Sequence, residues 1–175
     1  MSTAAHPAAF APSRTTVPPA LRAVVATDAA AAPLVARVSL ALVLLPHGAQ
    51  HALGWFGGYG FRGTLAWMTD TLGFPAPAAA LAIVVELLAP VALLFGLGGR
   101  LAALGLVGLM LGALSTHLPN GFFMNWFGAL PAGSEGFEYH LLAIALALVV
   151  VIDGSGAFSL DRRLARVGQP TPRAD

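Results

Sequence analysis

Four histidines and one acid occupy positions where polar side chains are unusual. The histidines lie at the ends of apolar stretches, on what would be one side of a membrane: His47 and His51 on one stretch, and His117 and His140 on two others. Glu86 lies inside a further stretch. Histidine exchanges protons near neutral pH, and imidazole also binds metals and haem. Polar groups are costly in hydrocarbon and usually serve a function when they occur there. The pattern indicates a site near one face of a membrane without naming a reaction.

The spacing around these residues predicts which of them meet. His47 and His51 are four residues apart, so they share one face of a helix. Glu86 lies about nine residues into its stretch, roughly 13 Å below the boundary at the rise of an α-helix. Pro90, four residues later, cannot donate to the Glu86 carbonyl. We expect Glu86 to face inward and to bond a histidine such as His47, with His117 as its other near polar partner.

Composition identifies the solvent that surrounds most of the chain. The 175 residues are 57% hydrophobic and only 10% charged, and the mean hydropathy is +0.78. Soluble domains carry about 25% charged residues, so this surface must face lipid instead of water. A net charge of +1 gives no reason to expect nucleic acid as a partner. The absence of cysteine excludes disulfides, iron–sulfur clusters and thiolate metal sites.

Four stretches are candidates to cross the bilayer, which takes about 20 helical residues. They cover residues 34–53, 77–97, 100–118 and 137–152, and the second and third are separated only by Gly98 and Gly99. We therefore predict an all-α, integral membrane four-helix bundle. Its long outer loops follow the first and third helices, at about residues 54–76 and 119–136.

Arginine placement predicts the orientation of these spans. All nine basic residues are arginines, and only Arg62 falls on the side of the long loops. The positive-inside rule then places both termini in the cytoplasm. All three tryptophans and both tyrosines fall on the opposite side, where amphipathic rings favour the headgroup layer. Charge and aromatic residues predict the same orientation.

We expect one membrane domain with a tail on either side. Residues 1–33 are rich in alanine and proline and are expected to form a flexible tail. Residues 34–153 form the four-span membrane domain. Residues 154–175 are expected to be a cytoplasmic amphipathic tail in which Ser159 caps a short helix that lies on anionic lipid.

Five blocks of sequence, in this order, resemble the DoxX family. They are HGAQHALGWFGGYG, VVELLAPVALLFGLGGRLAAL, THLPNGFF, GFEYHLLAIALAL and GSGAFSLDRRL, and together they span about residues 34–165. The resemblance implies a four-helix, multi-pass protein of the bacterial inner membrane. It also implies a membrane component of a redox or respiratory complex, because some members are linked to quinone-reducing oxidoreductases. His51 and His140 stand where the family commonly has lysine and an apolar residue or proline.

The sequence is compatible with three functions. The first is a redox subunit, and so a possible oxidoreductase, that handles quinone near the periplasmic side and receives electrons from a protein partner or a bound cofactor. The second is a protein that binds haem or a metal through its outer histidines. The third is a non-catalytic anchor or assembly subunit for a partner protein. An oligomer is compatible with each of the three.

The redox hypothesis assigns roles to named residues. Glu86, His47 and His117 are the candidate catalytic groups, with His51 and His140 nearer water. The candidate cofactor-binding residues share the outer end of the spans: His47, His51, His117, His140, Glu138 and Tyr139. The histidines do not predict which metal, if any, is bound.

Overall fold

A computed structural model describes residues 18–128, 130–131 and 133–166, and every regular element in these residues is helical. The long helices are α2 (Ala31–Leu53), α4 (Ala76–Phe95), α5 (Gly99–His117) and α6 (Glu138–Asp153). The short helices are α1 (Pro19–Val25), α3 (Gly60–Asp70) and α7 (Leu160–Arg166), with the 3₁₀ turns η1 (Trp55–Gly57) and η2 (Leu118–Asn120). The all-α prediction is confirmed.

Three segments are long and apolar enough to cross a membrane: α2, α4 and Gly99–Asn120, which is α5 extended by η2. Their surfaces carry exposed apolar side chains, as at Leu42 on α2, Leu81 on α4 and Leu101 on α5, each more than 60% exposed. Such surfaces belong against lipid. The chain therefore has the helices of a membrane protein. α6 has 16 residues, so the fourth crossing stays a prediction.

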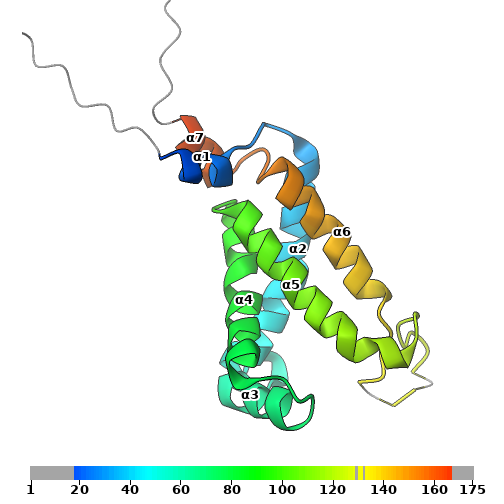
Figure 1. Cartoon of the computed structure of the whole chain (residues 1–175). Helices are drawn as coiled ribbons and strands as arrows, with labels where there is room; N and C mark the ends of the chain where they lie inside the picture. Colours follow the sequence, from blue (N-terminus) through cyan, green and yellow to red (C-terminus); the bar gives the residue numbers. More distant parts are fainter. Residues whose placement is uncertain (1–17, 129, 132, 167–175) are drawn as a thin grey trace, which may run out of the picture.

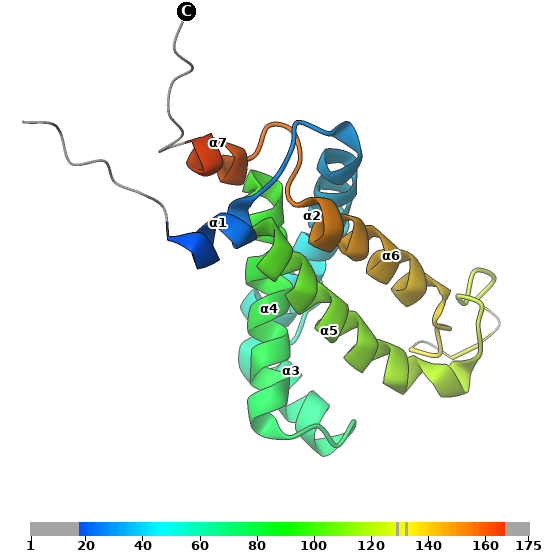
Figure 2. The same ribbon diagram turned by 45° about the horizontal axis from the view of Figure 1, so that its top comes forward.

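The long helices pack as two pairs. α2 packs along α4 and α5 packs along α6, while α4 contacts α5 and α2 contacts α6. In Figures 1 and 2 the pairs lie close together where α4 turns into α5, and α5 and α6 lean away from α4 toward their other ends. The shared core consists of buried small and branched residues, among them Leu44, Leu93, Leu106, Ala147 and Val150.

The turn from α4 to α5 occupies only three residues. Gly96 ends α4 in the left-handed conformation, with φ of 61°, and its N–H donates to the α4 carbonyls. A Cβ at Gly96 would lie 2.5 Å from that of Ser159, so both backbone conformation and space require glycine here. We call the end of the molecule that contains this turn, the start of α2 and residues 154–166 the closed end.

Arg37 binds the closed end together from inside. Its side chain is 1% exposed and donates to five backbone carbonyls. Two of these, Leu93 and Leu94, belong to the last turn of α4, where carbonyls lack helical partners. The other three follow α6, at Ser155, Ala157 and Phe158. From the sequence, Arg37 is expected only to be one of the arginines on the cytoplasmic side.

Asp161 completes the closed end from the opposite direction. Its carboxylate accepts from the N–H groups of Gly98 and Gly99 at the start of α5, at 2.7 and 2.9 Å, and from the hydroxyl of Ser155 at 2.6 Å. A carboxylate at a helix N-terminus satisfies donors that the helix cannot. Arg100 donates to the carbonyls of Val151 and Ile152 at the end of α6.

The structure describes part of each expected tail. Residues 19–25 form α1, which contacts α5 and α7 and buries Val25. Residues 154–161 are held in the closed end by the bonds of Arg37 and Asp161. Ser159 does cap α7, because its hydroxyl accepts from the N–H of Arg162 at 3.3 Å. Residues 1–17 and 167–175 lie outside the described residues.

Candidate functional site

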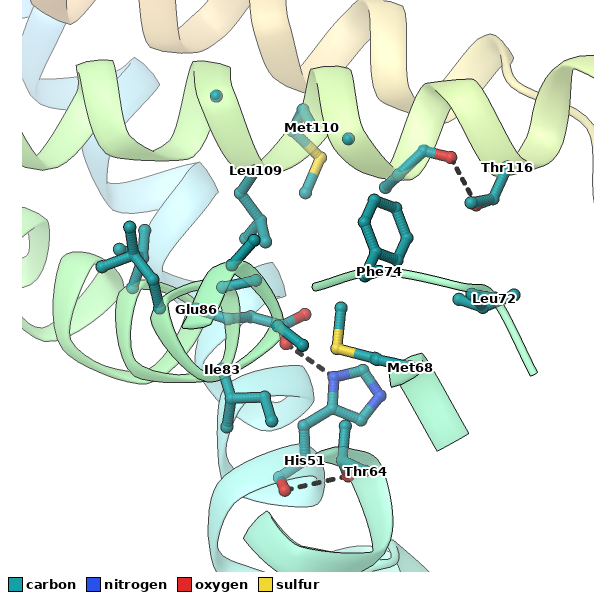
Figure 3. A pocket seen from close by; sticks show the side chains of 18 of the residues that line it. His51, Thr64, Met68, Leu72, Phe74, Ile83, Glu86, Leu109, Met110 and Thr116 are labelled. Atoms are coloured by element: carbon teal, nitrogen blue, oxygen red, sulfur yellow. Dashed lines mark hydrogen bonds and ion pairs between the residues drawn. The ribbon is translucent and has the colours of Figure 1, made fainter. Parts of the chain in front are cut away.

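A cavity of about 480 Å³ lies between α3, α4 and α5. That volume is within the range of small-molecule sites in proteins. Most of its wall is apolar, including Met68 of α3, Phe74 of the connection between α3 and α4, Ile83 of α4 and Met110 of α5. Five lining side chains carry polar groups besides the indole of Trp67: His51, Thr64, Glu86, Thr116 and His117. Figure 3 shows His51 and Glu86 bonded to each other beside Met68.

The bond between His51 and Glu86 is the central polar contact of this cavity. His51 Nδ1 lies 2.6 Å from Glu86 Oε2, and the side chains are 34% and 12% exposed. With an ionised acid the ring nitrogen donates, and with a neutral acid the carboxyl donates to the ring. The bond therefore persists when one proton moves between the two atoms. Such a pair accepts from or donates to a ligand as the ligand requires.

Backbone features hold the two partners at the same level. The His51 carbonyl accepts from the Thr64 hydroxyl at 3.0 Å, which ties the end of α2 to α3. One turn earlier on α2, a Cβ built on Gly48 would lie 2.4 Å from the Glu86 carbonyl oxygen. The carbonyl that Pro90 leaves without a helical donor thus faces a glycine on the neighbouring helix. Close approach of α2 and α4 at Gly48 brings His51 within reach of Glu86.

This geometry corrects the expected partner of Glu86. His51 bonds the acid, whereas His47 is exposed and does not line the cavity. Although the two histidines share a face, only the one nearer the helix end extends over Glu86. Which of two residues on one face meets a neighbouring helix depends on how far the helices slide along each other. The sequence carried one signal of that register, the glycine at position 48.

His117 and His140 form a second polar group. His117 lines the cavity, and its ring centroid lies 4.5 Å from that of His140 on α6. His117 Nδ1 donates to the Ala113 carbonyl at 2.8 Å, so a neutral ring leaves Nε2 as an acceptor. His140 is 7% exposed, and its Nδ1 has no hydrogen-bond partner among the described residues. The expectation that His140 lies nearer water is wrong.

Glu138 and Tyr139 have other surroundings. Glu138 Oε1 accepts from the backbone N–H of Met124 at 2.9 Å and from Trp126 Nε1 at 2.8 Å, so it orders the connection that precedes α6. The Tyr139 ring packs against the core and lies edge-on to His140 at 5.6 Å. Neither residue lines the cavity. Within the described ranges, no three His, Asp or Glu side chains are grouped to hold a metal ion.

Comparison with known proteins identifies the family. The family model for DoxX matches residues 32–126, more than half of the chain. The chain belongs to the DoxX family. The match covers α3, α4, α5 and all of α2 but its first residue, and every residue that lines the cavity falls within it. A search of curated proteins found no match for this DoxX chain, and a search of solved structures found none either.

Proposed function

We propose that this DoxX protein is a membrane subunit of a redox system and binds a quinone in the cavity, beside His51 and Glu86. The observation that carries the proposal is the placement of one proton-exchanging pair in an otherwise apolar wall. Quinone carbonyl oxygens accept hydrogen bonds, and the hydroxyls of the reduced form donate them. The pair offers a donor in one protonation state and an acceptor in the other. Electrons would come from a partner protein in the same complex.

Trp67 provides a direct test, because it lines the cavity. In a variant that keeps Trp67 and replaces Trp55 and Trp126 by phenylalanine, an added quinone should quench the remaining fluorescence. Glu86→Gln and His51→Leu should each weaken binding about tenfold or more, the effect of losing one hydrogen bond to a charged group.

Glu135→Gln serves as the matched control, since Glu135 does not line the cavity. It should bind quinone as the parent does. The proposal is wrong if quinone leaves the Trp67 fluorescence unchanged, or if Glu86→Gln and Glu135→Gln bind it equally.

The membrane arrangement belongs to the same proposal. We infer that α6 is the fourth span, that residues 34–153 form one domain in the bacterial inner membrane, and that both termini are cytoplasmic. Two observations support this. α6 packs along α5. Arg100 and Arg162 belong to the closed end and Arg22 to α1, which contacts α5 and α7, whereas Arg62 lies on α3.

Cysteine labelling tests this topology, because the chain has no cysteine of its own. Phe127 and Arg163 are exposed and flank α6. In intact spheroplasts a membrane-impermeant maleimide should label Phe127→Cys but not Arg163→Cys, and inverted vesicles should give the opposite result. Labelling of both positions from one side would show that α6 does not cross.

An assembly subunit is the second candidate, and the connection before α6 favours it. Its side chains Phe123, Trp126 and Phe127 are 73%, 75% and 97% exposed, yet Glu138 holds the backbone in one conformation. An ordered, exposed aromatic surface fits a docking partner. The two candidates differ in one outcome. If the protein only anchors its partner, Glu86→Gln should support full activity of the complex, and if it binds quinone that activity should fall.

A further inference from the structure

The cavity is elongated along α5. Its α5 lining begins at Gly105 and ends at His117, a separation of twelve positions or about 18 Å of helix. A Cβ on Gly105 would lie 3.2 Å from the side chain of Val85, the neighbour of Glu86 in sequence. Glu86 is also the last α4 residue in the lining. The His51–Glu86 pair therefore marks the inner end of the cavity, and His117 marks the other end, away from the closed end.

The two ends differ in free hydrogen-bonding capacity. At the outer end, the Thr116 hydroxyl and His117 Nδ1 both donate to the Ala113 carbonyl, each at 2.8 Å. Their donors are therefore used within their own helix, and they offer a ligand only acceptors, among them His117 Nε2. At the inner end, Glu86 has one hydrogen-bond partner among the described residues, and its pair with His51 offers a ligand a donor in one protonation state and an acceptor in the other. A ligand with one polar end therefore gains most by placing that end beside Glu86.

Gly108 and Gly112 form the wall between these ends, and protein packing does not explain them. No atom of the described residues outside their own helix surroundings lies within 4 Å of a Cβ built on either one. A glycine inside a helix costs roughly 0.5–1 kcal/mol relative to alanine. The two glycines therefore lower helix stability without allowing another helix of this chain to approach. What they do provide is a flat, open wall along the cavity.

We propose that Gly108 and Gly112 select the ligand by accommodating a long apolar tail. This inference rests on the proposed quinone function and deepens it: the ligand is a tailed quinone. Its ring lies beside His51 and Glu86, and its tail runs along α5 past Gly108 and Gly112 toward His117. A cavity about 18 Å long exceeds what a ring alone would fill. A phospholipid fits this site poorly, because its charged phosphate would have to leave the headgroup layer and enter a mostly apolar cavity to reach Glu86.

Gly112→Leu tests the tail position, using the Trp67 fluorescence assay with two quinones that share one ring. One quinone carries an isoprenoid tail and the other has no tail. The variant should lose at least tenfold in affinity for the tailed quinone and stay within twofold of the parent for the tail-less one. Its melting temperature should be equal or higher, since leucine is a better helix former than glycine and meets open space.

Ala145→Leu is the matched control, because it adds a leucine side chain to an exposed position on α6 outside the cavity. It should leave both affinities unchanged. Equal losses for the two quinones, or no loss for either, in Gly112→Leu would overturn the tail assignment while leaving quinone binding intact. A change from oligomer to monomer in Gly112→Leu would assign the glycines to contact with a second copy and would also overturn it. Failure of both quinones to bind the parent would overturn the proposed function itself.

Discussion

The hydrogen bond between His51 and Glu86 links α2 to α4 at a level where apolar side chains surround both groups. Glu86 is 12% exposed, and loss of its partner would leave a buried carboxyl group unsatisfied. His51 is one-third exposed, so water would replace part of its lost contact. Stability and the proposed quinone binding thus depend on the same pair, and removal of both partners should cost less than the sum of the two single removals.

A double-mutant cycle tests this dependence. His51→Leu and Glu86→Leu should each lower the free energy of unfolding by about 1–2 kcal/mol, because each leaves one polar group of the pair unpaired. The double variant should lose clearly less than the sum of the two. Thermal or chemical unfolding in detergent measures all four proteins. Additive losses would show that the two side chains do not stabilise each other.

The residues of the site were predictable by type but only partly by position. Glu86, His51 and His117 were candidate site residues by sequence, and all three line the cavity. The prediction of His47 as the partner of Glu86 was wrong, because the position of α2 along α4 cannot be read from either helix by itself. Arg37 was misjudged for a related reason. An arginine near the start of a span is usually solvated, and its carbonyl partners come from segments 56 and 118 residues away.

Among the helices, the contact between α2 and α4 has the least room for change. A Cβ at Gly48 would lie 2.4 Å from the Glu86 carbonyl oxygen and 2.7 Å from Leu87 Cα, both backbone atoms that cannot move independently of the helix. At Gly108 the same atom would meet open space. Gly48 and Gly108 therefore have opposite roles, since Gly48 permits contact between two helices and Gly108 leaves the cavity open.

Alanine at these two positions should give opposite changes in stability. Gly48→Ala should lower the free energy of unfolding by about 1–3 kcal/mol, because α2 and α4 must separate. Gly108→Ala should raise it by about 0.5–1 kcal/mol through helix propensity alone. Comparison of the two melting curves under identical conditions checks both. A stabilised Gly48→Ala protein would contradict the close approach of these helices.

Long apolar runs predicted α2, α4, α5 and α6 to within a few residues, since the bilayer imposes both length and composition. The short helices α1 and α3 were missed. α1 has seven residues and α3 has eleven. Helices this short are stabilised by contacts with the long helices more than by their own helix propensity. Contacts of this kind become visible only once the long helices are placed.

At the scale of the whole molecule, the closed end concentrates the polar contacts that join distant segments. Arg37 satisfies five carbonyls, and Asp161 satisfies the first donors of α5. Residues 155–161 thereby connect the first long helix to the turn between the second and third. The opposite ends of the helix pairs lack an equivalent connection among the described residues, and the cavity lies there between α3, α4 and α5.

Arg37→Lys should destabilise the molecule although it keeps the charge. An ammonium group has three donors and lacks the planar fork that reaches two segments at once, so at least two buried carbonyls lose their partner. We expect a loss of about 2–4 kcal/mol in the free energy of unfolding. Arg62→Lys on exposed α3 should change it by less than about 0.5 kcal/mol. Equal melting temperatures for the two variants would contradict the role of Arg37.

The contacts of the closed end can form only late in synthesis. Arg37 leaves the ribosome more than a hundred residues before Ser155, Ala157 and Phe158, whose carbonyls it will bind. Until those residues emerge, a buried cation and the first donors of α5 have incomplete partners. A nascent chain stopped before residue 155 should therefore be a preferred target of membrane proteases, whereas a chain that includes residues 155–161 has these partners in place.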